Sequence, residues 1–216
     1  SGVTKEHINY IIKNFELSSG HGGNAAKAIW PSELTENISY LTGALRDGTL
    51  AYYGKYEISY IQKDTRWLKI LKNMLKQEFK HNNKSRIVHY KGTSPKLTIS
   101  NRVIFEFFKR IINVPIGNKK EWSTPQLIKN SNKKLKRHYI SGFFDADGIV
   151  KSDGDVGLCQ ANKESLEDIQ KMLKTEGILC NPIRKNRIYY LYLKRRYKQK
   201  FVKYLYSSNL HKYERL

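Results

Sequence analysis

Hydrophobic residues recur along this chain with a helical period and then with a strand period. Between Thr35 and Arg46 the apolar positions include 38, 41 and 45, the spacing of one helix face. Gly48 follows as a stop signal. The next segments, TLAYYG and YEISYIQ, have strand composition and are joined at Gly54. The pattern therefore predicts a helix followed by a β-hairpin.

The same alternation continues and then occurs a second time. We expect a helix over 64–79, strands in SRIVHYKG and KLTIS, and a closing helix over 101–112. The second series predicts a helix over 132–146, strands in IVKSDG and VGLCQ with a turn at Asp153-Gly154, and a helix over 162–176. Strands in NPIRKN and IYYLYLK and a helix over 196–206 complete it. Each series therefore has the order αββαββα.

The two series are copies of one unit. IQKDTRWLKILKNMLK, from position 61, aligns with CQANKESLEDIQKMLK, from position 159, with Gln62 on Gln160 and a shift of 159 − 61 = 98 residues. An ordered set of matches at nearly constant offset indicates a duplication. We therefore predict an α+β fold of two repeats. The expected parts are an N-terminal extension (1–34), a first repeat (35–113), a linker (114–131), a second repeat (132–206) and a C-terminal tail (207–216).

Charge indicates the kind of partner. The chain has 40 Lys and Arg against 19 Asp and Glu, a formal net charge of +21, which a polyanion such as nucleic acid would offset. An anionic membrane is the rival reading. The basic residues are spread along the chain and interleaved with Tyr, whereas membrane binding usually gathers them on one amphipathic helix. We therefore expect a nucleic-acid partner and no membrane.

Composition also bounds the setting in which the chain works. No apolar run reaches the roughly 18 residues that span a bilayer, and no signal-peptide pattern is visible. Cys159 and Cys180 lack metal-type spacing and give no disulfide framework. We expect an intracellular, reducing compartment, such as a microbial cytoplasm or an organelle.

Two Asp-Gly pairs, Asp47-Gly48 and Asp147-Gly148, stand 147 − 47 = 100 residues apart. Asp-Gly is a favoured turn dipeptide, which is the simplest explanation of one occurrence. Here both carboxylates are expected at helix C-termini, where the helix dipole disfavours them by up to about 1 kcal/mol. Both follow small residues that let two helices approach. Two carboxylates brought together repel, and a divalent cation relieves the repulsion. Such a cation facing phosphate suits phosphodiester hydrolysis.

These residues carry a family resemblance. ISGFFDADGIV (140–150) resembles the LAGLIDADG motif, and YLTGALRDGTL (40–50) resembles a variant of it. The resemblance covers about residues 35–206. It implies a LAGLIDADG homing endonuclease of the monomeric two-motif type. The implied fold has two pseudo-symmetric repeats, each with a four-stranded antiparallel sheet. The sheets form a basic saddle over the DNA major groove, with helices on their other face and the two motif helices packed at the centre.

The resemblance also implies the chemistry and its ligands. It implies cleavage that depends on Mg²⁺ (or another divalent cation such as Mn²⁺) and a staggered cut in a long pseudo-palindromic double-stranded DNA target. Carried over by position, the acids before the final glycines are the metal ligands, which gives Asp47 and Asp147, with Gly48 and Gly148 at the same site. The earlier motif acid, Asp145, is not a ligand in the family.

The first motif departs from the family pattern. Aligned on its final glycine, it has Thr42 where the motif has a packing glycine, and Arg46 where the motif has a small residue. Aligned on Gly43 instead, it is one residue short. The counterpart of Asp145 is Leu45. Asp47 keeps its place in either alignment, but tight helix packing in this copy is left open.

Polar residues near the acids are further candidates. Relatives carry a Gln and then a Lys near the scissile phosphate, and Gln62-Lys63 matches this, with Arg66 one helical turn further on. The second copy has Gln160-Ala161, so its lysine is missing, and Lys163 or Lys151 is the candidate replacement. The linker segment GNKK resembles a loop lysine of related proteins. Lys119, or else Lys120, is therefore a candidate for stabilising developing negative charge.

Base reading is expected on the strand faces, because long donors on a twisted ribbon can enter the major groove. The alternative is that these residues are the solvent face of ordinary half-exposed sheets. The candidates are Tyr53, Lys55, Glu57, Arg86, His89, Lys91, Lys96 and Thr98 in the first copy, and Lys151, Arg184, Lys185, Arg187, Tyr190 and Tyr192 in the second.

Three readings of the function remain. The first is a site-specific DNA endonuclease with Asp47 and Asp147 at its metal site. The second is a descendant that has lost cleavage and binds DNA as a regulator or intron RNA as a maturase, which the imperfect first motif and the missing second lysine favour. The third is an endonuclease module of an intein. Retention of both acids favours the first reading.

Overall fold

The computed structural model describes residues 28–80, 85–117, 122–209, 212 and 214. Most of the N-terminal extension and both Lys119 and Lys120 therefore lie outside the described residues. Helix α2 begins after Thr35, whose hydroxyl accepts the Ile38 N–H at 3.1 Å. The first repeat comprises α2 (Glu36–Ala44) with a 3-10 turn (Leu45–Asp47), β1 (Gly48–Tyr52), β2 (Tyr56–Ile61), α3 (Thr65–Phe79), β3 (Arg86–Val88), β4 (Lys96–Ser100) and α4 (Arg102–Glu106).

The second repeat has the same order. A short helix, α5 (Gln126–Lys129), lies between the two repeats. The second repeat then comprises α6 (Lys133–Asp147), β5 (Gly148–Val150), β6 (Val156–Gln160), α7 (Lys163–Thr175), β7 (Arg184–Lys185), β8 (Tyr189–Tyr192), a 3-10 turn (Arg195–Tyr197) and α8 (Lys198–Tyr204). The predicted αββαββα order is confirmed in both copies.

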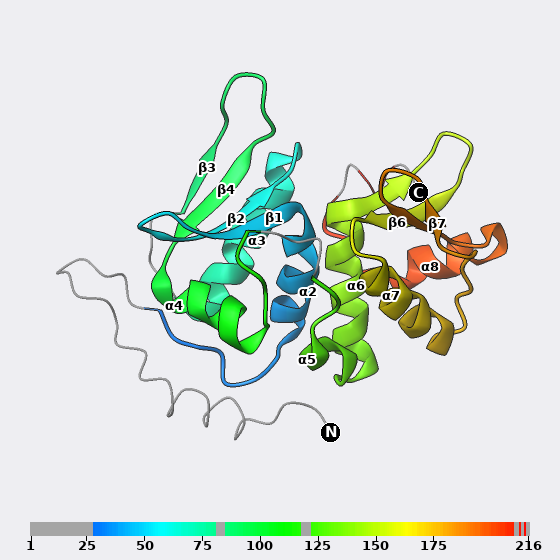
Figure 1. The fold of residues 1–216 in the computed structure, drawn as a ribbon, viewed down its shortest axis with the longest axis horizontal. Coiled ribbons are helices and arrows are strands. Elements are labelled where there is room, and N and C mark those ends of the chain that lie inside the picture. The colour runs from blue at the N-terminus through cyan, green and yellow to red at the C-terminus, as the bar shows by residue number, and fades with distance from the viewer. Residues whose placement is uncertain (1–27, 81–84, 118–121, 210–211, 213, 215–216) are drawn as a thin grey trace.

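Each repeat builds its own four-stranded antiparallel sheet. The strand orders are β1-β2-β4-β3 and β5-β6-β8-β7, and the register matches Gly48 with Tyr60 and Gly148 with Leu158. Figure 1 shows the two sheets on either side of a central pair of helices, α2 and α6. The predicted pseudo-symmetric arrangement of two sheets around the motif helices is therefore confirmed.

Helices cover one face of each sheet because their apolar stripes are buried against it. Trp67, Leu68, Leu71 and Leu75 of α3 are fully buried, in one cluster with the inward side chains of β1, β2 and β4. A second cluster joins α6 and α7 to β6 and β8. The opposite face carries Glu57, Lys96 and Thr98 in the first sheet, and Tyr190, Tyr192 and Arg184 in the second.

The central helices touch backbone to backbone. A Cβ at Gly43 would lie 2.1 Å from the Tyr139 carbonyl oxygen, and a Cβ at Gly142 would lie 2.0 Å from the Tyr40 carbonyl oxygen. No side chain fits at either position. Gly43 is therefore the packing glycine of the first motif, and the one-residue shortening is absorbed where α2 becomes a 3-10 turn. The tight packing left open for the first copy is present.

Some element boundaries differ from the prediction. The closing helix expected over 101–112 changes at Phe107 into a π-helical turn (Phe107–Ile111), in which the neighbouring Phe107 and Phe108 are both buried. The expected strand 85–92 ends at Val88, so His89 and Lys91 lie beyond it in a loop. Gly92, with φ of +80°, turns the chain back toward β4. No helix within the described residues is long and apolar enough to cross a bilayer.

Candidate active site and nucleic-acid interface

Asp47 and Asp147 end the two motif helices at the same end of the central pair. Both are half-buried, and each directly precedes the first strand of its sheet. Asp47 lies four residues beyond Gly43 and Asp147 five beyond Gly142, which is about 6 to 8 Å along the helix axis past the crossing. The packed glycines therefore bring the two carboxylates to one end of one interface.

The glycines after these acids are needed for space. A Cβ at Gly48 would lie 2.2 Å from the Ser59 carbonyl oxygen of β2, and a Cβ at Gly148 would lie 2.2 Å from the Phe144 carbonyl oxygen. Neither glycine has a positive φ. Their role in the structure is to let the chain turn from helix into strand against backbone atoms, and this fixes the direction in which each acid leaves its helix.

Each acid has a glutamine beside it, at the matching position of its own repeat. The Gln160 amide Nε2 donates to Asp147 Oδ2 at 2.8 Å, while its Oε1 accepts the Ala161 N–H at 2.7 Å. In the first copy Gln62 Nε2 lies 3.5 Å from Asp47 Oδ2, and Gln62 Oε1 accepts the Lys63 N–H at 2.8 Å. The amide oxygen thus fixes the side-chain orientation, so that the amide N–H₂ is directed at the carboxylate. The contact is tighter in the second copy.

Two further side chains show that the acids share one neighbourhood. The Cys159 thiol donates to the Asp147 carbonyl oxygen at 3.4 Å. Burial and then the charge of Asp147, with a smaller effect of Asp47, raise the pKa of Cys159 to about 11. The charges of the same two carboxylates and of Asp145 act to raise the pKa of Lys212. The charges of Asp47 and Asp147 therefore both act on the pKa values of two side chains, Cys159 and Lys212.

Lys212 is a site residue that the sequence analysis did not identify. Its Nζ donates to the carbonyl oxygens of Ala146 at 2.6 Å and Phe144 at 3.1 Å, at the C-terminal end of α6. Burial lowers the pKa of Lys212, although Asp147, Asp145 and Asp47 act to raise it. One feature of the sequence pointed to such a group. Helix α6 has no basic residue in its last turn, so a cation from elsewhere in the chain can interact favourably with its C-terminal end.

The residues present fit a hard divalent cation. Asp47 and Asp147 offer carboxylate oxygens, the ligands that Mg²⁺ and Ca²⁺ prefer. Within the described part of the chain no group of three or more His, Cys, Asp and Glu is placed to hold a metal. A cation held by these two acids would therefore complete its shell with backbone carbonyls, water or phosphate oxygens. Mg²⁺ usually binds in this manner, through one or two carboxylates.

The other predicted catalytic lysines are less clearly placed. Lys63 is exposed directly after Gln62. Lys163, a candidate for the second copy, pairs with Glu167 at 2.8 Å. Lys151, the other candidate, lies 4.4 Å from the Tyr192 ring and 3.8 Å from Asp155. Lys119 lies outside the described residues. Lys212, by contrast, binds the Phe144 and Ala146 carbonyls just before Asp147, and the Asp147 charge acts on its pKa.

The strand register decides which first-repeat candidates share a face. Thr98 of β4 pairs with Arg86 of β3 on one side and with Ser59 of β2 on the other. These three residues therefore lie on one face of the sheet, the face away from α3. Glu57 and Lys96 lie on the same face and form an ion pair at 2.7 Å. Tyr53, Lys55, His89 and Lys91 are exposed in the loops at the strand ends. Arg66 is bound to Asp64 at 3.1 Å, at the start of α3.

In the second repeat the register separates two neighbours that the sequence had grouped. Arg184 is opposite Tyr190, on the face that also carries Tyr192 and Cys159. Lys185 is opposite Tyr189, on the helix-covered side, and its Nζ lies 5.6 Å from that ring. Tyr190 and Tyr192 stack at 6.2 Å with an interplanar angle of 3°. Arg187 is exposed in the β7–β8 turn. Lys185 therefore lies on the opposite face of the sheet from Arg184, away from the face predicted to read bases.

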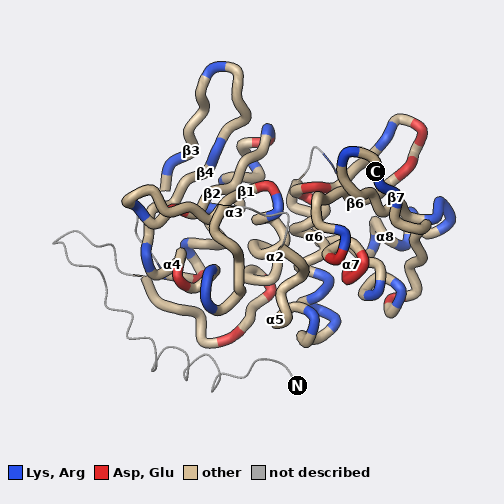
Figure 2. Tube along the Cα trace, viewed as in Figure 1, with Lys and Arg blue, Asp and Glu red and all other residues tan. Residues whose placement is uncertain are grey.

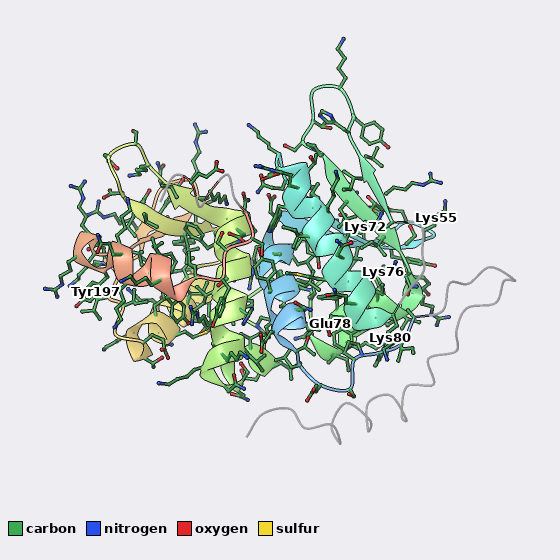
Figure 3. All side chains as sticks on the ribbon, turned by 180° about the vertical axis from the view of Figure 1, so that it is seen from behind. Lys55, Lys72, Lys76, Glu78, Lys80 and Tyr197 are labelled. Carbon is green, nitrogen blue, oxygen red and sulfur yellow. The ribbon has the colours of Figure 1, made fainter. Side chains whose placement is uncertain are left out.

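Positive charge is not confined to the sheet faces. Figure 2 shows Lys and Arg on strand ends and helices of both halves. Exposed Lys69, Lys76 and Lys80 follow α3 on its solvent side, and Figure 3 shows Lys72, Lys76 and Lys80 on this helix from behind. On α7, by contrast, Lys163 is paired with Glu167. Part of the +21 charge therefore lies away from the predicted saddle.

Comparisons with known proteins agree with this geometry. Residues 134–206 match the family described as LAGLIDADG-like domain. The chain is 29% identical over 149 residues to the homing endonuclease I-ApeI of Aeropyrum pernix, which covers 65% of this chain and 66% of that protein. It is 31% identical over 147 residues to the tRNA-splicing ligase RtcB of Pyrococcus furiosus, covering 60% of this chain and 15% of that protein.

A solved structure shows the same fold. The crystal structure of I-DmoI in complex with DNA and Mn superposes with a TM-score of 0.65 at 22% identity, covering 82% of this chain and 99% of that one. At this identity the likeness concerns the fold. The match to I-ApeI spans 66% of that relative, and the match to the ligase a much smaller share, so the activities of these whole proteins are not transferred to this chain by similarity alone.

Proposed function

We propose that this chain, which belongs to the LAGLIDADG homing endonuclease family, is a site-specific double-stranded DNA endonuclease that hydrolyses one phosphodiester bond on each strand and leaves a staggered cut. The observation that carries the proposal is the pairing of Asp47 and Asp147. Each ends a motif helix, each has a glutamine beside it, and the two helices are locked by Gly43 and Gly142. Descendants that only bind nucleic acid have no evident use for two acids so arranged next to phosphate.

The chain's own residues divide the work as follows. Asp47 and Asp147 hold the cation, and Gln62 and Gln160 orient their carboxylates. Lys212 adds positive charge at the same end of the helices. The outward sheet faces and loop tips contact DNA through Tyr53, Lys55, Arg86, His89, Lys91, Lys151, Arg184, Arg187, Tyr190 and Tyr192. Arginine and lysine on such faces bind phosphates and bases.

We propose Mg²⁺ as the working ion, with Mn²⁺ able to replace it in the assay, because the acidic ligands offer oxygen alone. When bound, the cation would polarise the phosphate and make a coordinated water a stronger nucleophile at neutral pH. One chain carries both repeats, each with its own sheet, which supports action as a monomer. Cys159 and Cys180 are both free thiols, which supports work in a reducing compartment.

The test is cleavage of a randomised DNA library, because the target sequence is unknown. The wild type with Mg²⁺ should cut a small set of long, related sites. Asp47→Asn and Asp147→Asn should each lower the rate about 10²-fold or more, since several kcal/mol of charge stabilisation is lost. DNA affinity in Ca²⁺, measured by gel shift, should stay within about threefold of the wild-type value.

Three results would change the proposal. Full cleavage by the Asp47→Asn/Asp147→Asn double variant would refute the assignment of the acids. Specific DNA binding by the wild type without any cutting, in Mg²⁺ and Mn²⁺, would leave a DNA-binding regulator. Binding of structured RNA in preference to duplex DNA would favour the maturase reading.

A further inference from the structure

Asp145 is a buried acid that the proposed reaction does not use. It lies in α6, is 0% exposed, and faces the interface between the two repeats. Burial raises its pKa above the usual aspartate range, although hydrogen bonds from Ser207 and Tyr40 act to lower it. An ionisable group kept in the core without a catalytic task needs another reason, and its hydrogen-bond partners supply one.

The first set of partners comes from the opposite repeat. The Tyr40 hydroxyl of α2 donates a short hydrogen bond to Asp145 Oδ2. Trp67 Nε1 of α3 donates in turn to the Tyr40 oxygen at 2.7 Å. Tyr40 and Trp67 are both almost completely buried. Asp145 is thereby joined to the first repeat through a chain of satisfied polar groups.

The second set comes from the end of the chain. The Ser207 hydroxyl donates to Asp145 Oδ1 at 2.5 Å, and the N–H groups of Ser208 and Asn209 donate to Oδ2 at 2.7 and 3.1 Å. The Asn209 Nδ2 donates to the Asp145 carbonyl oxygen at 3.1 Å. A segment that the sequence analysis placed in a C-terminal tail is therefore fastened to the second motif helix.

This fastening decides where Lys212 lies. Asn209 is 2% exposed, and its Oδ1 accepts the Lys212 N–H at 3.3 Å. The Lys212 Nζ then reaches the Ala146 and Phe144 carbonyls, beside Asp147. Asn209 thus contacts both Asp145 and Lys212, and it links the buried acid to the active-site lysine.

The first copy holds its own following segment in a parallel way. Arg46 is 4% exposed and donates to the carbonyl oxygens of Trp122 at 2.5 Å and Ser123 at 3.0 Å, in the stretch that follows the first repeat. Asp145 holds the stretch that follows the second repeat by accepting from N–H groups. Arg46 and Asp145 are the buried charged residues of the two motifs, and each binds the segment that follows its own repeat.

We propose that Asp145 is a positioning residue: it seats Ser207–Asn209 on α6 and so holds Lys212 at the shared end of the motif helices, where the Lys212 charge supports cleavage. The inference rests on the proposed endonuclease function. It assigns an active-site role to the C-terminal segment and supplies the basic group that the second copy lacks after Gln160.

The experiment is a double-mutant cycle on the cleavage rate. Lys212→Ala should slow cleavage about tenfold or more, as loss of an aligned charge near reacting phosphate does. Asp145→Ala should slow it by a similar factor. The double variant should be within about twofold of Lys212→Ala alone, because Asp145 acts only through Lys212. Asp145→Asn keeps an oxygen for the two backbone N–H groups and should restore most of the rate.

A second measurement follows the segment itself. Carboxypeptidase digestion followed by mass spectrometry should trim Asp145→Ala back past Asn209, whereas in wild type and Asp145→Asn the trimming should leave Ser207–Asn209 and Lys212 in place. Lys76→Ala, which removes an exposed lysine of α3, is the matched control and should change neither readout. Should Asp145→Ala fail to fold, Asn209→Ala takes its place in the cycle with the same expectations.

The outcomes separate this inference from the proposed function. Additive losses in the cycle, or a wild-type cleavage rate in Asp145→Ala, would overturn the positioning role while the endonuclease remains. A wild-type rate in Lys212→Ala would overturn the role of the lysine. Cleavage that survives loss of both Asp47 and Asp147 would instead overturn the function on which the inference rests.

Discussion

Gly43 of the first motif helix and Gly142 of the second lie against each other's helix, each facing a backbone carbonyl of the partner helix. The space at each would be overfilled by one methyl group, since the nearest backbone atoms would be 2.1 and 2.0 Å from a Cβ. This contact fixes the distance between the helices. It therefore also fixes how near Asp47 and Asp147 come to each other at the helix ends.

We predict that Gly43→Ala and Gly142→Ala each destabilise the fold by about 1–3 kcal/mol or more, because overpacking forces the helices apart. Cleavage should fall further than stability accounts for, since the carboxylates separate. Thermal unfolding and cleavage at a temperature where the variant stays folded check this. Asn73→Ala, at an exposed position of α3, is the control. Unchanged cleavage in a folded Gly142→Ala protein would contradict the account.

Arg46 should matter for the joining of the two repeats. Besides its bonds to the linker carbonyls, it donates to the Tyr139 hydroxyl at 2.8 Å and lies 3.9 Å from the Trp122 ring. Arg46→Met keeps the length of the side chain but leaves buried acceptors without a donor. We expect a loss of about 2–4 kcal/mol in denaturant unfolding. Arg66→Met, at an exposed ion pair, should cost at most about 1 kcal/mol. Equal effects at both positions would refute the linker role.

The glutamines should contribute unequally to the two strand cuts. Gln160 lies 2.8 Å from its acid and Gln62 lies 3.5 Å from its own. Gln160→Ala should therefore slow its strand more than Gln62→Ala slows the other, and it should accumulate nicked plasmid. Strand-specific end labelling measures both rates. A reversed order, with Gln62→Ala the more harmful, would show that these orienting contacts do not limit the rate.

His138 should make the stability depend on pH. Its Nε2 lies 3.1 Å from Glu36, across the interface, and its ring stacks on Tyr206 at 4.4 Å. Burial lowers the folded-state pKa of His138, although Glu36 acts to raise it; nearby Lys134 and Arg137 add to the lowering. The unfolded chain therefore binds more protons, and stability is lost as the pH falls from about 6.5 through the folded-state pKa.

The variant His138→Gln should remove that loss. Between pH 7 and pH 5 the melting temperature of the wild type should drop more than that of His138→Gln. His89→Gln, at an exposed loop position, should follow the wild type. A larger drop in His138→Gln than in the wild type would mean that protonation of His138 favours the fold, opposite to the expectation.

The sequence predicted the repeated fold because its signals are local and occur twice. Apolar spacing, Asp-Gly stops and turn glycines determine each element, and the duplication gives every assignment a second copy. Gly54 and Gly154 have φ of +68° and +86°, as their turn positions require. The acids and their glutamines were also identifiable, since each stands at or next to the end of a helix or strand and recurs in the second copy 100 or 98 residues later.

The parts that sequence could not supply depend on contacts between distant segments. Lys212 reaches α6 across more than 60 residues, and Asp145 depends on partners from both ends of the chain. The separation of Arg184 from Lys185 follows from strand register, which a two-residue strand does not reveal in its sequence. The packing role of Gly43 likewise required the partner helix to be present.

The most direct test of the shared metal site is anomalous scattering from Mn²⁺ in crystals of the chain bound to a DNA site recovered from the library. We predict Mn²⁺ bound within about 2.0–2.6 Å of carboxylate oxygens of both Asp47 and Asp147. That signal should be lost in the Asp47→Asn/Asp147→Asn variant. Mn²⁺ bound away from these two residues in a complex that still cuts its DNA would contradict the account.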